Sequence, residues 1–116
     1  MGKPEGKIED YLIKQVELNG CLCYKFVSPG KNGVPDRIVI APPNKTIFVE
    51  VKAPYGRVRP LQRCAIRAMR KHGAPVFVAH TKEAVDILTQ FITENDYDYI
   101  CNHEHIPDII NPETYF

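Results

Sequence analysis

The 116-residue sequence predicts one α/β domain, with elements in the order α-β-β-β-α-β-α and a mixed sheet flanked by helices. Two observations lead to this prediction. Segments with an apolar residue every three to four positions alternate with short runs of β-branched and aromatic residues. The length and the 44% hydrophobic composition suit a single globular domain, which we expect over 1–116, with a core at about 6–92 and a C-terminal extension at 93–116.

The first half of the chain is expected to form one helix and three strands. Residues 6–19 repeat apolar groups with a helical period, and Gly20 follows as a stop. Residues 21–27, 36–41 and 46–52 are rich in strand formers, and turns containing proline separate them. The last two strands are therefore expected to pair as a hairpin.

The second half is expected to add a helix, a strand and a second helix. Pro60 suits the first position of a helix that Gly73 ends. Residues 75–80 predict the fourth strand, and Thr81 is a candidate cap for a helix that reaches about Asn95. The apolar positions predict that the buried stripe of the helix from Pro60 consists of Leu61, Ala65, Ala68 and Met69.

The charges divide the chain into two parts. Residues 1–80 hold 14 basic and 6 acidic residues, a net charge of +8, whereas residues 81–116 have a net charge of −7. Seven basic residues and no acid lie between Lys52 and Lys71. This block indicates a polyanionic partner, and the alternative is a solvated helix face.

Composition also excludes several function classes. No apolar run reaches the roughly 20 residues of a membrane span, so no membrane is expected. The sequence has no P-loop string, so no nucleotide cofactor is expected. Its four cysteines match neither a zinc nor a disulfide pattern, which favours a reduced, cytoplasmic location (the host cytoplasm for a phage protein).

The predicted hairpin brings charged residues together. If the hairpin is symmetric about Pro43, Asp36 lies directly opposite Glu50, and Lys52 shares their face because side chains alternate along a strand. Apolar neighbours on both faces predict a sheet that is covered on both sides. Two opposed carboxylates repel each other, and a divalent cation such as Mg²⁺ or Mn²⁺ would compensate them. The alternative is an ion pair of Lys52 with one carboxylate and no metal.

Two strings in this region resemble a nuclease signature. Pro35-Asp36, followed by Glu50-Val51-Lys52, is similar to the PD-(D/E)xK motif. A longer pattern resembles the VRR-NUC family, the virus-type replication-repair nucleases, in the compact stand-alone form found in phages. That pattern consists of Gly33-Val-Pro-Asp-Arg37, Phe48-Val-Glu-Val-Lys52 and Gln62.

The resemblance implies a restriction-endonuclease-like αβββαβ core, a Mg²⁺ or Mn²⁺ site and hydrolysis of DNA phosphodiesters. It implies that Asp36, Glu50 and the backbone carbonyl of Val51 are metal ligands. Lys52 would be the catalytic lysine, and Gln62 would support the site.

The resemblance also implies one acid from the first helix. We expect Glu9, because it flanks the apolar stripe, whereas Asp10 and Glu17 are placed to pair with Lys14. The alternative for Glu9 is a surface glutamate that interacts with the helix dipole.

DNA is the expected polyanion once a nuclease site is placed beside the basic block. The residues expected to contact DNA are Tyr55, Arg57, Arg59, Arg63 and Arg67, with Arg70 or Lys71 continuing the helical stripe. We therefore expect a metal-dependent DNA endonuclease that acts on branched DNA as a homodimer, with the C-terminal extension at the interface. The alternatives are a linear-duplex or flap endonuclease of the same fold and a non-catalytic DNA-binding module.

Overall fold

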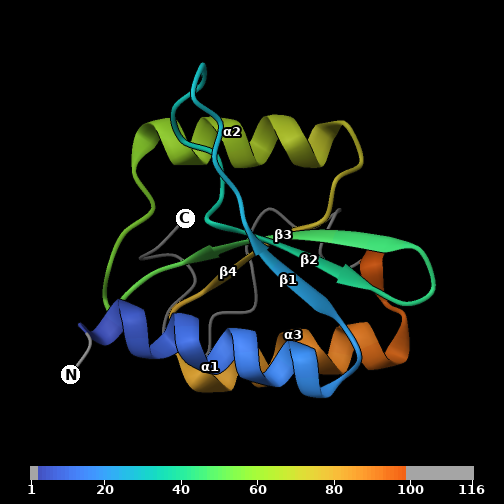
Figure 1. Cartoon of the computed structure of the whole chain (residues 1–116). Helices are drawn as coiled ribbons and strands as arrows, with labels where there is room; N and C mark the ends of the chain where they lie inside the picture. The colour runs from blue at the N-terminus through green and yellow to red at the C-terminus, as the bar shows by residue number, and fades with distance from the viewer. Residues whose placement is uncertain (1–2, 99–116) are drawn as a thin grey trace.

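The computed structural model describes residues 3–98 (Figure 1). It contains a four-stranded sheet with the strand order β1-β2-β3-β4, in which β3 and β4 are parallel and the other pairs are antiparallel. The elements are α1 (Pro4–Leu18), β1 (Leu22–Lys25), β2 (Arg37–Ala41), β3 (Lys45–Val51), α2 (Pro60–Lys71), β4 (Val76–Ala79) and α3 (Lys82–Glu94). The predicted fold class and element order are confirmed.

The β2–β3 hairpin has the register that symmetry about Pro43 predicts. Arg37 pairs with Val49, and Ile38 pairs with Phe48. Continuing this register by one residue places Asp36 opposite Glu50. On the other side of β3, Glu50 pairs with Val78 of β4, so Glu50 lies on an interior strand of the sheet.

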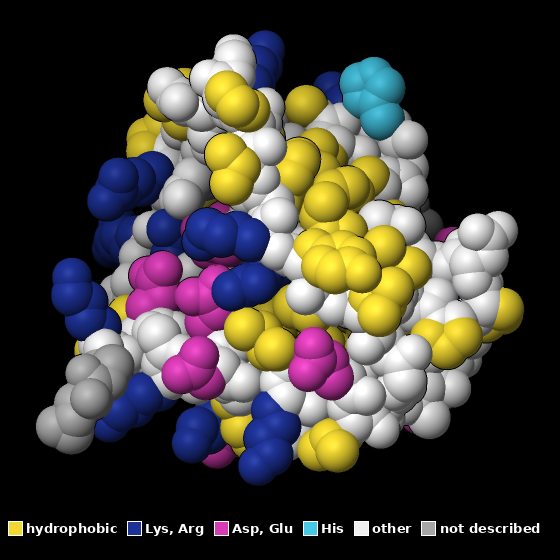
Figure 2. Space-filling view, in the orientation of Figure 1, with side chains coloured by type: hydrophobic (Ala, Val, Ile, Leu, Met, Phe, Trp, Pro, Cys, Tyr) yellow, Lys and Arg dark blue, Asp and Glu magenta, His cyan; other side chains and the backbone are white. Residues whose placement is uncertain are grey.

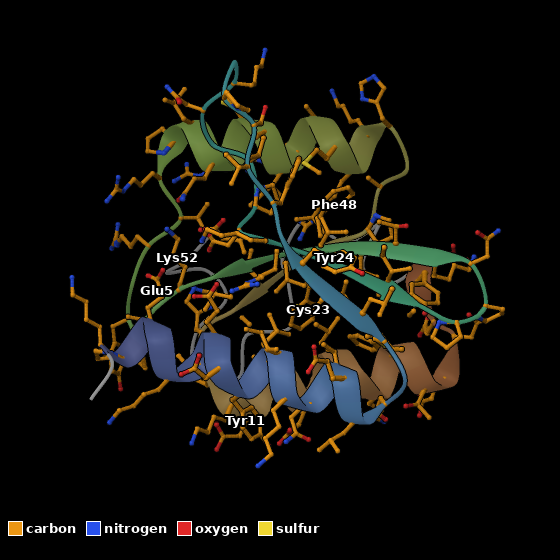
Figure 3. The ribbon with its side chains drawn as sticks, in the orientation of Figure 1. Glu5, Tyr11, Cys23, Tyr24, Phe48 and Lys52 are labelled. Carbon is orange, nitrogen blue, oxygen red and sulfur yellow. The ribbon has the colours of Figure 1, made fainter. Side chains whose placement is uncertain are left out.

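The two faces of the sheet are covered unequally. Helices α1 and α3 lie together against one face, where Val39, Val49 and Val51 are completely buried (Figure 1). Helix α2 lies over the other face, and there β1 and β2 leave apolar side chains in contact with solvent. Tyr24 of β1, for example, is 54% exposed, whereas Phe48 of β3 is half-buried (Figure 3). Figure 2 shows hydrophobic side chains gathered on this side of the molecule. The expectation that both faces are covered is therefore wrong for the β1–β2 half of this face.

The inward face of α2 also differs from the predicted stripe. Leu61 is 63% exposed and Ala68 is exposed, whereas Ile66 and Arg70 are buried. The guanidinium of Arg70 donates to the Val76 carbonyl oxygen from Nε at 3.2 Å and from Nη2 at 2.7 Å. This partner allows an arginine to point inward, so Arg70 does not belong to an outward basic stripe.

Two further expectations concern the ends of the chain and the membrane. The dimer-forming role predicted for the C-terminal extension depends mainly on residues 99–116, which lie outside the described residues. Among the helices within residues 3–98, none is long and apolar enough to cross a bilayer.

Candidate active site

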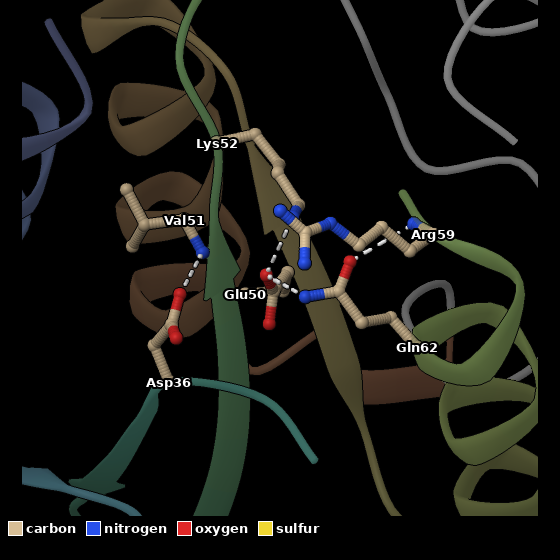
Figure 4. Close-up of polar contacts among 6 residues, drawn as sticks. All are labelled: Asp36, Glu50, Val51, Lys52, Arg59 and Gln62. Carbon is tan, nitrogen blue, oxygen red and sulfur yellow. Dashed lines mark hydrogen bonds and ion pairs between the residues drawn. The ribbon is translucent and has the colours of Figure 1, made fainter. Parts of the chain in front are cut away.

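The predicted site residues Asp36, Glu50, Lys52 and Gln62 come together where β2 begins and β3 ends (Figure 4). Asp36 directly precedes β2, and its Oδ2 accepts a hydrogen bond from the backbone N–H of Val51 at 3.1 Å. This bond ties the start of one strand to the end of the next. The two carboxylates are thus held by neighbouring strands.

Glu50 is the most constrained member of the site, with only 1% of its surface exposed. Its Oε2 accepts from Lys52 Nζ at 3.2 Å and from Gln62 Nε2 at 3.0 Å. Its Oε1 is also buried, but has no hydrogen-bond partner among the described residues. Burial, and secondarily the charge of Asp36, raise the pKa of Glu50 to about 7, although Lys52 acts in the opposite direction.

Gln62 connects the carboxylate to helix α2. Its Nε2 donates to Glu50, and its Oε1 accepts from the backbone N–H of Arg59 at 2.9 Å, directly before the helix begins (Figure 4). Both ends of the amide are therefore used. Gln62 fixes the side chain of Glu50 and satisfies one backbone donor at the start of α2.

The donor set fits a hard divalent cation. A buried carboxylate oxygen without a partner, next to a second carboxylate, is a position where positive charge is missing. Within residues 3–98, no three His, Cys, Asp or Glu side chains gather around one point. Mg²⁺ is commonly held by one or two carboxylates and completes its shell with water and substrate phosphates, so two carboxylates suffice.

Two of the acids of the first helix, Glu5 and Glu9, bear on the site in different ways. Glu9 Oε2 accepts from Arg37 Nε at 2.8 Å, in an ion pair. Glu5, one turn earlier, adds to the raised pKa of Glu50 and is labelled near Lys52 in Figure 3. Sequence reasoning missed Glu5 because it placed the helix start at residue 6. Pro4 at the first helical position was the available signal.

The residues expected to contact DNA lie in the loop after β3 and in α2 as far as Arg67. Arg57, Arg59 and Arg67 are exposed, whereas Arg63 is half-buried. Figure 2 shows Lys and Arg side chains gathered around acidic ones on one side of the molecule.

Tyr55, in the loop after β3, combines an exposed side chain with an unusual backbone conformation. It is 75% exposed and has a φ of 67°, at the third position of a turn closed by the Gly56 N–H and the Ala53 carbonyl at 2.8 Å. Glycine or asparagine is favoured at such a position. A tyrosine there carries backbone strain, and its ring is exposed to solvent.

Comparisons with known proteins agree with this geometry. The sequence model of the VRR-NUC domain matches residues 22–83, a range that contains Asp36, Glu50, Lys52 and Gln62. A relative from Acyrthosiphon pisum secondary endosymbiont phage 1, named "Putative nuclease p44", is 42% identical over 82 residues, which cover 71% of this chain and 82% of the relative. A solved structure described as a VRR_NUC domain superposes with a TM-score of 0.73 at 34% identity and covers 77% of this chain and 97% of that one.

The family match spans more than half of the sequence, and the curated relative is similar well beyond the motif itself. The structural match extends the likeness to the fold over 77% of this chain. This chain belongs to the VRR-NUC domain family of nucleases.

Proposed function

We propose that this protein is a divalent-metal-dependent DNA endonuclease that hydrolyses phosphodiester bonds. The observation that carries the proposal is the buried Glu50 carboxylate, which has one oxygen without a partner and lies beside Asp36 and Lys52. A purely structural carboxylate would be expected to have both oxygens satisfied or to face water. A role in metal binding and catalysis would explain why the protein keeps a buried carboxylate oxygen that lowers its stability.

Asp36, Glu50 and the backbone carbonyl of Val51 would hold the cation. Glu9, or Glu5 one turn earlier, would be the acid from α1 near the site, and in residues 3–98 neither gathers with the two carboxylates around one point. A bound Mg²⁺ or Mn²⁺ lowers the pKa of a coordinated water and polarises a phosphoryl oxygen. Holding Glu50 in place is the task of Gln62, through the hydrogen bond from its amide.

Lys52 has a separate role in this proposal. Its ammonium group, which lies 3.2 Å from Glu50 Oε2, would stabilise the negative charge that develops on a phosphoryl oxygen or orient the attacking water. A donor that is already in position needs little reorganisation during the reaction. Its side chain is only 12% exposed, so it acts close to a poorly solvated carboxylate, where electrostatic interactions are stronger than in water.

Branched DNA is the substrate we propose, and a homodimer is the proposed acting form. Tyr55, Arg57, Arg59, Arg63 and Arg67 would contact the strand near the site. Phosphate contacts position DNA without reading its sequence, which suits recognition of shape. A two-fold dimer would offer one site to each of two strands. The cytoplasmic location inferred from the cysteines stays a prediction.

Cleavage of labelled DNA tests the proposal. A four-way junction, a flap and a linear duplex are incubated with the protein in Mg²⁺, Mn²⁺ or EDTA. We expect metal-dependent cleavage that is fastest on the junction, lost in Glu50→Gln and kept in Glu17→Gln, a control on an exposed α1 acid. Faster cleavage of the duplex or flap favours the linear or flap enzyme, and binding without cleavage in either metal favours the non-catalytic module.

A further inference from the structure

The loop between β1 and β2 and the first turn of α2 enclose an open pocket next to the site. Figure 1 shows this loop rising over α2. The pocket has a volume of about 500 Å³, and we call it the loop–helix pocket. Its lining includes Asn32, Val34, Arg59, Pro60, Leu61 and Gln62. The proposed reaction assigns no function to this pocket.

The backbone of the loop lies directly against the first turn of α2 at the edge of the pocket. Gly33 has a φ of +91°, and a Cβ atom there would lie 2.6 Å from the Leu61 carbonyl oxygen. Only glycine combines this backbone conformation with so close an approach. Any other residue at position 33 would push the loop away from α2 and change the shape of the pocket.

The lining suits a flat ring with polar edges. Val34, Pro60 and Leu61 supply apolar surface, and Leu61 is 63% exposed although it is a large apolar side chain. Asn32 offers an amide, and Arg59 offers a guanidinium that stacks on rings. Small-molecule pockets typically measure about 300–1,000 Å³ and combine apolar walls with a few polar groups. A phosphate alone would have no use for the apolar walls.

The pocket is continuous with the candidate active site through one side chain. Gln62 lines the pocket and donates to Glu50 Oε2 at 3.0 Å. The segment from Lys52 to Lys71 around it is basic and contains no acid. A polyanion drawn to this segment would thus place one of its bases within reach of the pocket.

We propose that the loop–helix pocket binds an unpaired nucleobase of the DNA substrate, next to the phosphate that is cut. The inference rests on the proposed function and narrows its substrate class. A base inside a duplex must be unpaired and unstacked before it can enter such a pocket, whereas a base at a fork or bulge enters at little cost. Among branched DNAs, those with an unpaired or easily opened nucleotide beside the cleaved bond are therefore the preferred substrates.

The test uses the full chain with Ca²⁺ in place of Mg²⁺, to hold back cleavage. The probes are two duplexes of equal length, one fully paired and one with a single unpaired 2-aminopurine. Leu61→Ser removes the apolar wall at an exposed position, and Leu18→Ser, on the 71% exposed leucine of α1, is the matched control. Affinity, 2-aminopurine fluorescence and melting temperature are measured for each protein.

We expect wild type and Leu18→Ser to bind the bulged DNA about tenfold more tightly than the paired DNA and to change the probe's fluorescence. Leu61→Ser should lose most of that preference, with paired-DNA affinity and melting temperature unchanged. Equal preference in all three proteins would overturn the proposal, as would an equal loss of both affinities in Leu61→Ser, which indicates a backbone contact.

Cleavage in Mg²⁺ separates this inference from the function beneath it. If wild type cuts both DNAs at the same rate and Leu61→Ser does likewise, the pocket proposal fails while the nuclease proposal stands. If wild type cuts neither of these DNAs nor the four-way junction in any divalent metal, the proposed function fails, and the pocket proposal fails with it.

Discussion

Neighbouring residues of strand β3 lie in two different environments, one on each face of the sheet. Val49 and Val51 point into the core beneath the sheet and are completely buried among other apolar side chains. Glu50, between them, points to the α2 side and is as deeply buried, but next to Asp36 and Lys52. One face contributes stability through apolar burial, whereas the other holds a charge that destabilises the fold. Truncating a side chain on the apolar face should therefore lower the stability of the protein, whereas neutralising a carboxylate on the other face should leave stability unchanged or raise it.

The largest expected effect comes from neutralising the carboxylates. Asp36→Asn or Glu50→Gln should abolish cleavage while DNA binding persists, because the pair is then no longer able to hold a cation. Without metal, thermal stability should be unchanged or higher, because a like-charge contact is removed. Cleavage assays, binding assays and thermal melts check this. Turnover retained in both variants would contradict the metal site at these residues.

Lys52→Ala should lower the cleavage rate by about 10²–10³, the usual cost of removing one stabilising donor from a transition state. Metal affinity should change less than the rate, because the ammonium is not a ligand. Single-turnover kinetics and calorimetric metal titration measure the two effects separately. Loss of metal binding as the main defect would assign Lys52 a different role.

The stability of the protein should depend on pH through Glu50, on the charged face of the sheet. Glu50 ionises near pH 4.5 in an unfolded chain and near 7 in the folded protein. Between these values the folded state keeps a proton that the unfolded state has lost, so the free energy of unfolding falls as pH rises. The total loss from about pH 4.5 to above 7 is at most about 3 kcal/mol.

Denaturant unfolding of the metal-free protein between pH 5 and 8 measures this loss. Glu50→Gln should remove the Glu50 contribution. On the core face, Leu88→Ala removes a completely buried side chain and should cost about 2–5 kcal/mol, equally at each pH. The same pH profile in wild type and Glu50→Gln would show that Glu50 does not titrate in this way.

The smallest expected effect concerns the basic surface. Replacing Arg57 and Arg59 with alanine should weaken binding to all DNA sequences alike and flatten the slope of log K against log salt by about 0.9 per lost phosphate contact. A salt titration in Ca²⁺ compares this variant with wild type. An unchanged slope would indicate a solvated surface, and a sequence-dependent loss would indicate base contacts.

Local chemistry in the sequence was enough to predict the framework. The proline turn and the flanking strands predicted the register that pairs Ile38 with Phe48, because hairpin pairing follows from turn position and alternation. Pro60 and Gly73 predicted the limits of α2, since the first lacks an N–H that a helix start does not need and the second adopts a φ of +88°. The motif residues then followed from strand alternation and the family resemblance.

The tertiary structure alone decided how polar groups are buried. Hydrophobic periodicity placed Leu61 inside and Arg70 outside, but the structure reverses both, because Arg70 finds the Val76 carbonyl. Similarly, the partner of Glu9 is Arg37, and the unsatisfied oxygen of Glu50 exists only once the sheet and α2 enclose it. A buried polar side chain is stable only with a partner, and that partner is brought close by the fold, not by its place in the sequence.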